Sequence, residues 1–309
     1  MFIINLNKSY ALRRAVKGRG AMAYEVAILF GDLINPYWQE QELWYRKYLP
    51  DFPFNAQIVR LSGRCDAEEQ ADLCRRLLRD NLDALIVNAL DKDTLGRAAA
   101  GVRSRTVLVD AGPKIDPAVT VSIGHYLPLR VCDYQEQGKL CVQALLEQKK
   151  TIKRLGCIGG PKEALQSRAR VAGALSALRA LTKIETRILW SDFTRRGGEE
   201  SLEAFMDWQP DALFCANDLM ALGALDVLEA TGRKIPVGGI DMIPSAVFSV
   251  RNGGMAATVG VNGSDVVLGL LHAVDDYLSF GLIEPDFLAC NHVVTSWSLG
   301  AQKRRRRFL

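Results

Sequence analysis

The feature that most constrains the fold of this 309-residue chain is a regular alternation of short apolar runs with longer amphipathic segments. From residue 24 onward, each run rich in apolar and β-branched residues is followed by a segment with helical periodicity. Single helices between strands imply right-handed βαβ units and therefore parallel sheets. The strands that this pattern predicts are residues 25–30, 56–61, 84–88, 106–110, 119–123, 154–159, 184–190, 211–215, 235–240, 257–261 and 292–296.

The strand pattern restarts near residue 124, which divides the chain into two halves. Because each half contains its own set of strands and helices, we predict an α/β fold of two doubly wound parallel-sheet lobes. In open parallel sheets, ligands bind beyond the carboxyl ends of the strands. A cleft between the strand ends of the two lobes is therefore the expected binding site, and the polar residues that follow the strands are the candidates for lining it.

Basic charge is concentrated at the two ends of the sequence. The chain has 39 Lys and Arg residues against 35 Asp and Glu residues, but five basic and no acidic residues lie in 1–23 and five more basic residues lie in 303–307. The segment between these ends is therefore net acidic, and the overall charge is no evidence for a nucleic-acid-binding surface on it. We predict no direct binding of nucleic acid by this chain.

Cysteine usage and the N-terminal residues bear on the cellular compartment. The seven cysteines form no CxxC pair and no zinc-ligand spacing, so we expect no metal, and no cofactor motif is present. Free cysteines within apolar runs are typical of a reducing compartment. A secretory signal needs an apolar core before its cleavage site, and none precedes Ala21-Met22-Ala23. These observations favour the cytoplasm.

Candidate binding residues follow the predicted strands of the first half. Asn35 suits the N-cap of a helix that Pro36 begins. Tyr37 and Trp38 are adjacent, so they point to different faces of that helix. This spacing fits one aromatic ring facing the cleft, and it also fits one core and one surface ring. Asp110 ends the strand at 106–110.

The second half offers Asn217, Asp241, Arg168 and Arg170 in comparable positions. Taken singly, Asn217 is a preferred helix N-cap and Asp241 is a common turn residue. Two arginines near a helix start oppose the helix dipole, so another interaction should favour them. Together, aromatic rings, carboxylates, amides and an arginine suit a small polyhydroxylated ligand. Rings cover the C–H face of a sugar, carboxylates accept from its hydroxyls, and arginine and asparagine donate to its oxygens.

The chain resembles the periplasmic sugar-binding proteins of the ribose-binding type, together with the effector domains of LacI-type regulators, over about residues 24–297. The segments that carry the resemblance are Asn35-Pro36-Tyr37-Trp38, Val107-Leu108-Val109-Asp110, Arg168-Ala169-Arg170-Val171-Ala172-Gly173, Asn217-Asp218-Leu219-Met220-Ala221-Leu222-Gly223-Ala224, Gly239-Ile240-Asp241 and Ala256-Ala257-Thr258-Val259. The first arginine of R-x-R-x-x-G is the ligand contact that the resemblance implies. It implies a type I periplasmic-binding-protein-like fold with the ligand-binding residues Asn35, Tyr37, Trp38, Asp110, Arg168, Asn217 and Asp241.

Three places depart from the family pattern. Ala111 stands where an arginine commonly follows the first binding aspartate. Val261 stands where a polar residue is common, with Asn262 one position later. The segment that opens the second lobe has two rival alignments, at 124–126 and at 133–134. The loss of one arginine and one amide argues against plain ribose and leaves the ligand identity open.

The resemblance also implies how the lobes are connected. It implies a hinge that the chain crosses near residues 123–125, 261–263 and 288–291, with the lobes closing on the ligand. The corresponding division is a basic N-terminal extension at 1–23, a first lobe at 24–123 plus 262–290, a second lobe at 124–261 plus 291–300, and a basic tail at 301–309.

No catalytic motif accompanies these residues. The sequence lacks GxGxxG, GxxxxGK[ST], HExxH and GxSxG, and its three histidines are far apart, so we predict a binding protein and not an enzyme. One hypothesis is the solute-binding component of an ABC-type sugar transport system, periplasmic by resemblance, with a membrane permease or sensor as partner. The alternative is a cytoplasmic effector-binding domain of a LacI-like transcriptional or signalling regulator without its DNA-binding domain, for which a dimer fits. In both, the ligand is a sugar or polyol.

Overall fold

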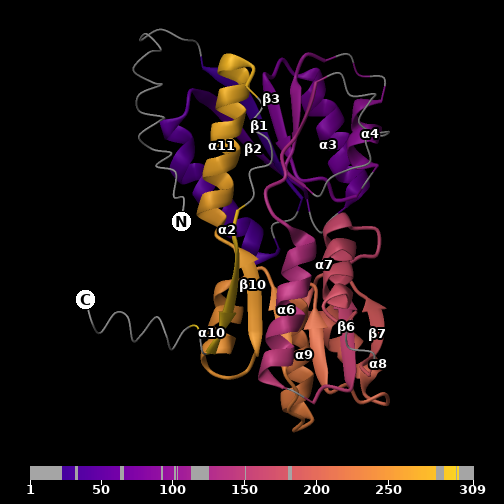
Figure 1. Ribbon diagram of the computed structural model, residues 1–309. Helices are drawn as coiled ribbons and strands as arrows, with labels where there is room; N and C mark the ends of the chain where they lie inside the picture. Colours follow the sequence, from indigo (N-terminus) through magenta and orange to yellow (C-terminus); the bar gives the residue numbers. More distant parts are fainter. Residues whose placement is uncertain are drawn as a thin grey trace, which may run out of the picture.

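The computed structural model describes residues 23–31, 34–62, 66–91, 93–100, 102, 104–112, 125–149, 151–179, 183–282, 289–296 and 298. These residues form two α/β lobes, one above the other in Figure 1.

In the first lobe, five parallel strands lie in the order β2-β1-β3-β4-β5. The strands are β1 Tyr24–Phe30, β2 Phe54–Arg60, β3 Ala84–Val87, β4 Val107–Asp110 and β5 Tyr126–Pro128. The helices are α2 Pro36–Tyr48, the short 3₁₀ turn η1 Leu49–Asp51, α3 Ala67–Arg79, α4 Thr94–Ala99 and α11 Gly263–Phe280.

The second lobe contains a six-stranded sheet in the order β11-β10-β9-β8-β6-β7. The strands are β6 Arg154–Gly159, β7 Glu185–Trp190, β8 Ala212–Cys215, β9 Val237–Ile240, β10 Ala257–Val261 and β11 Asn291–Thr295. The helices are α6 Tyr134–Gln148, α7 Leu165–Ser176, α8 Arg195–Phe205, α9 Asp218–Ala230 and α10 Pro244–Arg251. The two predicted parallel-sheet lobes are confirmed, with one correction: β11 pairs antiparallel with β10. The chain leaves this lobe after β10 and re-enters it from the same side, so β11 runs in the opposite direction.

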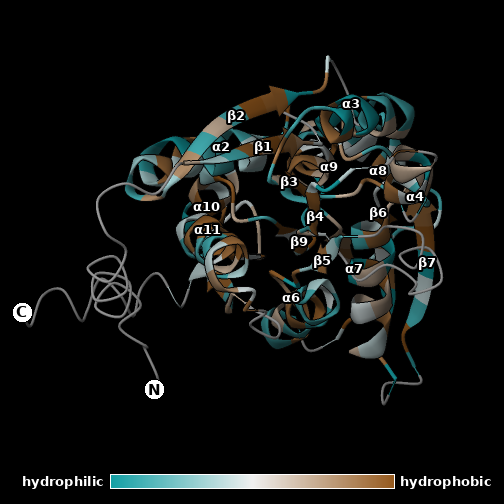
Figure 2. Cartoon of the chain, turned by 90° about the horizontal axis from the view of Figure 1, so that it is seen from above, coloured by the Kyte–Doolittle hydropathy of each residue, from teal (hydrophilic) through white to brown (hydrophobic). Residues whose placement is uncertain are grey.

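The apolar runs that predicted the strands form the cores of the lobes. Strands β3, β4, β8 and β9 are buried along their whole length, as expected of parallel strands that helices cover on both faces. Figure 2 shows hydrophobic colour on the inner strand β3 and mostly hydrophilic colour on α3. Asp66 caps α3 by accepting hydrogen bonds from the backbone N–H groups of Glu68 and Glu69. No helix within the described residues is long and apolar enough to cross a membrane.

The chain passes between the lobes at three places, and one of them differs from the expectation. The predicted strand at 119–123 lies outside the described residues, and the fifth strand of the first sheet is β5. The first lobe therefore extends beyond the predicted boundary at 123, and the first crossing is at 129–133. The second crossing is at Asn262, between β10 and α11, and the third lies between α11 and β11. Figure 1 shows α11 beside α2 in the upper lobe and β10 in the lower lobe.

Helices α6 and α7 pack against each other through two glycines. A Cβ atom added to Gly138 of α6 would overlap the backbone carbonyl of Arg170, and one added to Gly173 of α7 would overlap the backbone carbonyl of Gln135. The missing side chains allow the two backbones to touch, so the two glycines set the position of α7 relative to α6.

We predict that Gly173→Ala destabilises the second lobe, because its methyl group would force the two helices apart. The expected loss in the free energy of unfolding is about 3 kcal/mol or more, because the added methyl group would meet backbone atoms of Gln135. It is measured by chemical denaturation. Gly232→Ala is the matched control, since a Cβ there meets no atom within 4 Å. It should cost about 1 kcal/mol through its left-handed backbone alone. Equal losses in the two variants would contradict the packing role of Gly173.

Candidate functional site

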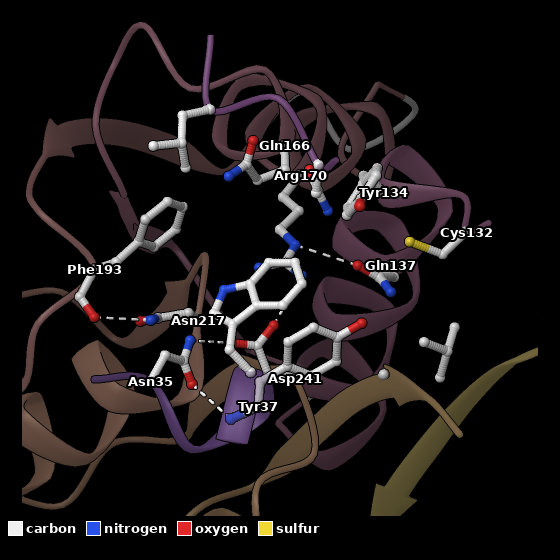
Figure 3. Close-up of a pocket in the computed structure, with 15 residues that line it drawn as sticks. Asn35, Tyr37, Cys132, Tyr134, Gln137, Gln166, Arg170, Phe193, Asn217 and Asp241 are labelled. Atoms are coloured by element: carbon white, nitrogen blue, oxygen red, sulfur yellow. Dashed lines mark hydrogen bonds and ion pairs between the residues drawn. The ribbon is translucent and has the colours of Figure 1, made fainter. Parts of the chain in front are cut away.

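A cavity lies between the two lobes, beside residues that follow the carboxyl ends of strands in both sheets. Figure 3 shows the side chains that line it. It holds about 640 Å³ of empty space, including the part that opens to solvent. The lining residues come from both lobes and from the first crossing: Asn35, Tyr37, Trp38, Asn88, Leu90, Cys132, Tyr134, Gln137, Gln166, Arg170, Phe193, Asn217, Asp241, Gly260 and Val261.

Asn35 connects the two lobes directly. Its backbone conformation and its position before Pro36 make it the N-cap of α2, and its Oδ1 accepts from the Tyr37 backbone N–H at 3.0 Å. This bond leaves the amide group facing the second lobe. There Nδ2 donates to Oδ2 of Asp241 at 3.1 Å. The predicted cap therefore also contributes a hydrogen bond that spans the cleft.

Arg170 and Asp241 form a buried ion pair in the second lobe. Arg170 Nη2 lies 2.8 Å from Asp241 Oδ1, and the two side chains are 9% and 4% exposed. The guanidinium also donates from Nη1 to the Ala216 carbonyl at 2.8 Å and from Nε to Gln137 Oε1 at 3.2 Å. Burial raises the pKa of Asp241, while the charge of Arg170 and the hydrogen bonds from Arg170 and Asn35 oppose this rise. The pair presents hydrogen-bonding groups to the cavity without a net charge.

Four aromatic rings enclose this polar group. Tyr37 and Trp38 pack edge to face with ring centroids 5.0 Å apart, and both line the cavity. The sequence left open whether one ring faces the cleft, and the structure places both rings at the cavity. Tyr134, the first residue of α6, lies with its ring centroid 5.5 Å from the Arg170 guanidinium carbon. Phe193 lines the cavity with a left-handed backbone conformation, φ 65°.

Asn217 holds the Phe193 segment in place. Its Oδ1 accepts from the Met220 backbone N–H at 3.0 Å, which makes it the N-cap of α9. Its Nδ2 donates to the Phe193 carbonyl at 2.8 Å. The N-cap interpretation and the cleft position of Asn217 are thus both correct, because one amide serves the helix with its oxygen and the cavity wall with its nitrogen.

Two predicted site residues do not line the cavity. Arg168 is exposed to solvent, and Arg170 occupies the place expected for it. Residues two apart on a helix point to nearly opposite sides, so only one arginine of the motif can face the cleft. Asp110 is 2% exposed. Its Oδ2 accepts from the Tyr126 hydroxyl at 2.7 Å and its Oδ1 accepts from the Gly112 N–H at 2.9 Å.

Several lining residues were not predicted. Tyr134 and Gln137 belong to the segment that opens the second lobe, and of its two rival alignments the structure favours 133–134: Asp133 caps α6. Neither His125 nor Tyr126 lines the cavity. Phe193 lies in a segment without a motif, and Gln166 lies two residues before the R-x-R-x-x-G motif without belonging to it. Val261 contributes an apolar wall, and Asn262 caps α11 through the Ser264 N–H.

The described residues contain no group of three or more His, Cys, Asp or Glu side chains able to hold a metal ion. Cys132, the thiol at the cavity wall, is buried among aromatic rings, and burial raises its pKa to about 11. The groups that line the cavity include hydrogen-bonding side chains and aromatic rings.

Asp110 gives a pH dependence that can be measured. Burial raises its pKa to about 6, although hydrogen bonds from Tyr126, Gly112 and Ala89 oppose this rise. A carboxyl whose pKa is raised on folding contributes its full stability below its unfolded pKa of about 3.9, and the contribution is lost as the pH rises to about 6.

We therefore predict that the wild-type protein loses stability relative to Asp110→Asn between about pH 4 and about pH 6. The expected change in the free energy of unfolding is on the order of 3 kcal/mol, from urea titrations of both proteins across this range. The asparagine cannot titrate, so subtraction removes the contributions of other groups. A constant difference between the two proteins would show that Asp110 has an ordinary pKa.

Comparisons with known proteins agree with this geometry. The family profile described as a periplasmic binding protein domain matches residues 26–281. The HTH-type transcriptional repressor PurR of Aliivibrio salmonicida is 27% identical over 235 residues, which are 72% of this chain and 67% of PurR. The ribose import binding protein RbsB of Bacillus subtilis is 25% identical over 232 residues, 72% of each chain. The crystal structure of a Caulobacter myo-inositol binding protein, with myo-inositol bound, has a TM-score of 0.75 at 22% identity, covering 93% of this chain and 97% of that one. The chain therefore belongs to the family of periplasmic binding protein domains.

Proposed function

We propose that the cavity binds a small, neutral, polyhydroxylated ligand, a sugar or a polyol, without chemically changing it. The observation that carries this proposal is the neutral Arg170–Asp241 pair among amides and aromatic rings at the meeting point of the lobes. A charged ligand would bring an unpaired charge into this enclosed space, which is costly. A neutral ligand with several hydroxyls matches the available donors and acceptors, and its C–H groups match the rings.

The broader role that we propose is that of the solute-binding component of an ABC-type sugar transport system. Its support is the similarity to the ribose import binding protein and the fold shared with a myo-inositol binding protein. The similarity to PurR favours a second candidate, the effector-binding domain of a LacI-like regulator. Deletion of the gene separates them: loss of uptake of the bound sugar supports transport, whereas altered transcription with normal uptake supports regulation.

We further propose that the ligand stabilises a closed arrangement of the lobes. In the structure, Asn35 of the first lobe bonds to Asp241 of the second, and Tyr37 packs against the core of the second lobe. Opening would break both contacts, and a ligand that touches both walls would favour closure by its higher affinity for the closed form.

A conservative substitution in the ion pair tests the site. Arg170→Lys keeps the charge but cannot reproduce the three-way hydrogen bonding of the planar guanidinium to Asp241, Ala216 and Gln137. We expect binding to weaken by at least roughly tenfold, which corresponds to the loss of charge-assisted hydrogen bonds. The measurement is titration calorimetry with whichever of D-allose, D-ribose and myo-inositol raises the melting temperature of the wild-type protein.

Arg168→Lys is the matched control, because Arg168 lies two residues away on the same helix and is exposed. Its affinity should equal that of the wild-type protein. Equal weakening of binding in both variants would contradict the assignment of Arg170 to the binding site. If no sugar or polyol in a tested set binds the wild-type protein, the proposed ligand class is wrong.

A further inference from the structure

Asp218 carries a fully buried carboxyl group that does not line the cavity. It follows Asn217 in the sequence, and because Asn217 already caps α9, helix capping does not explain why a carboxyl group is buried at position 218. Its two oxygens accept from the Thr258 hydroxyl at 2.8 and 2.9 Å, and Oδ2 also accepts from the Ile243 backbone N–H at 3.0 Å. Burial raises the pKa of Asp218 to about 8, and the nearby charge of Asp241 contributes. A carboxyl in such a site is costly to bury, so its contacts need an explanation.

Those contacts converge on the turn at residues 241–243. Thr258, on β10, accepts from the Met242 backbone N–H at 3.1 Å through the same hydroxyl that donates to Asp218. Asp218 and Thr258 thereby bind two successive N–H groups of the turn, those of Met242 and Ile243. The turn is attached to α9 and β10 by these bonds, at the end of β9.

The turn needs such support because its backbone is strained. Asp241 has φ 124° and Met242 has φ 59°, two consecutive residues other than glycine in the region that favours glycine. Each such residue costs about 1–3 kcal/mol and persists only when its surroundings hold it. Gly260 gives the turn room, since a Cβ there would lie 2.9 Å from the Asp241 carbonyl carbon.

We propose that Asp218 is a positioning residue of the binding site, which acts through Thr258 and the turn to direct the Asp241 carboxylate at Arg170 and Asn35. The backbone conformation of the turn directs the Asp241 side chain toward the cleft, where its carboxylate accepts hydrogen bonds from Asn35 and Arg170. The ligand-binding consequence rests on the proposed function, whereas the positioning of Asp241 does not.

The first test needs no ligand: crystal structures of Thr258→Val and Thr258→Ser. Valine keeps the shape of threonine but removes the hydroxyl, and serine retains the hydroxyl. We expect the Asp241–Arg170 contact of 2.8 Å to be lost in the valine variant and kept in the serine variant, with the second-lobe sheet unchanged in both. An unaltered contact in the valine variant would overturn the proposal.

Substitutions of Asp218 provide an independent arm if the valine variant does not fold. Asp218→Asn keeps an acceptor for the Ile243 N–H and should preserve the Asp241–Arg170 contact. Asp218→Leu, of similar size but without an acceptor, should lose it. A leucine variant that folds and keeps the contact would also overturn the proposal.

The second test is a double-mutant cycle in binding, using D-allose or myo-inositol, whichever the wild-type protein binds. Thr258→Val should weaken binding at least roughly tenfold in the wild-type background and by less than twofold beside Asp241→Asn, because its effect passes through Asp241. Equal losses in the two backgrounds would indicate a general structural role and overturn the proposal. If no sugar or polyol of a wider set binds the wild-type protein, the proposed function fails, and the crystal structures still decide the role of Asp218.

Discussion

The buried ion pair between Arg170 and Asp241 is the interaction on which the rest of the site depends. Removing one partner of such a pair leaves an uncompensated buried charge, at a cost of about 3–5 kcal/mol. Here two further donors of the guanidinium bind the Ala216 carbonyl and Gln137, and the second carboxylate oxygen accepts from Asn35. Because all three guanidinium nitrogens and both carboxylate oxygens have a protein partner, the pair holds its geometry before any ligand arrives.

Neither lobe contains the whole site. The second lobe supplies the ion pair, and the first lobe supplies Asn35, Tyr37 and Trp38 from the start of α2. Each lobe also contributes a side chain that packs against the other lobe. Tyr37 of the first lobe packs against the core of the second, and Leu165 of the second lobe packs against a core of the first. We propose that the three crossings act as a common hinge, so that the site is assembled only when the lobes meet.

Asn35 and Asp241 could be placed in the cleft from the sequence, because residues that follow a parallel strand emerge at its carboxyl edge. The choice between Arg168 and Arg170 could not be made in this way, since the face that α7 presents depends on its packing against α6. Asp110 also ends a strand, but the hydroxyl of Tyr126 from the neighbouring strand covers it, and strand order decides that contact. The direction of β11 likewise follows from the path of the chain through the hinge and not from its residues.

The accessibility of Cys132 tests most directly whether the ligand occupies the cleft between the lobes. Its thiol lines the cavity, whereas Cys290 is exposed and outside the lining. The measurement is the rate of alkylation of each cysteine by iodoacetamide, followed by mass spectrometry, with and without saturating D-allose or myo-inositol, whichever raises the melting temperature. We predict that the bound ligand slows alkylation of Cys132 at least roughly tenfold, because a closed complex must open before the reagent reaches the thiol, and that it leaves the rate at Cys290 unchanged. An unchanged rate at Cys132 with the sugar bound would contradict this prediction.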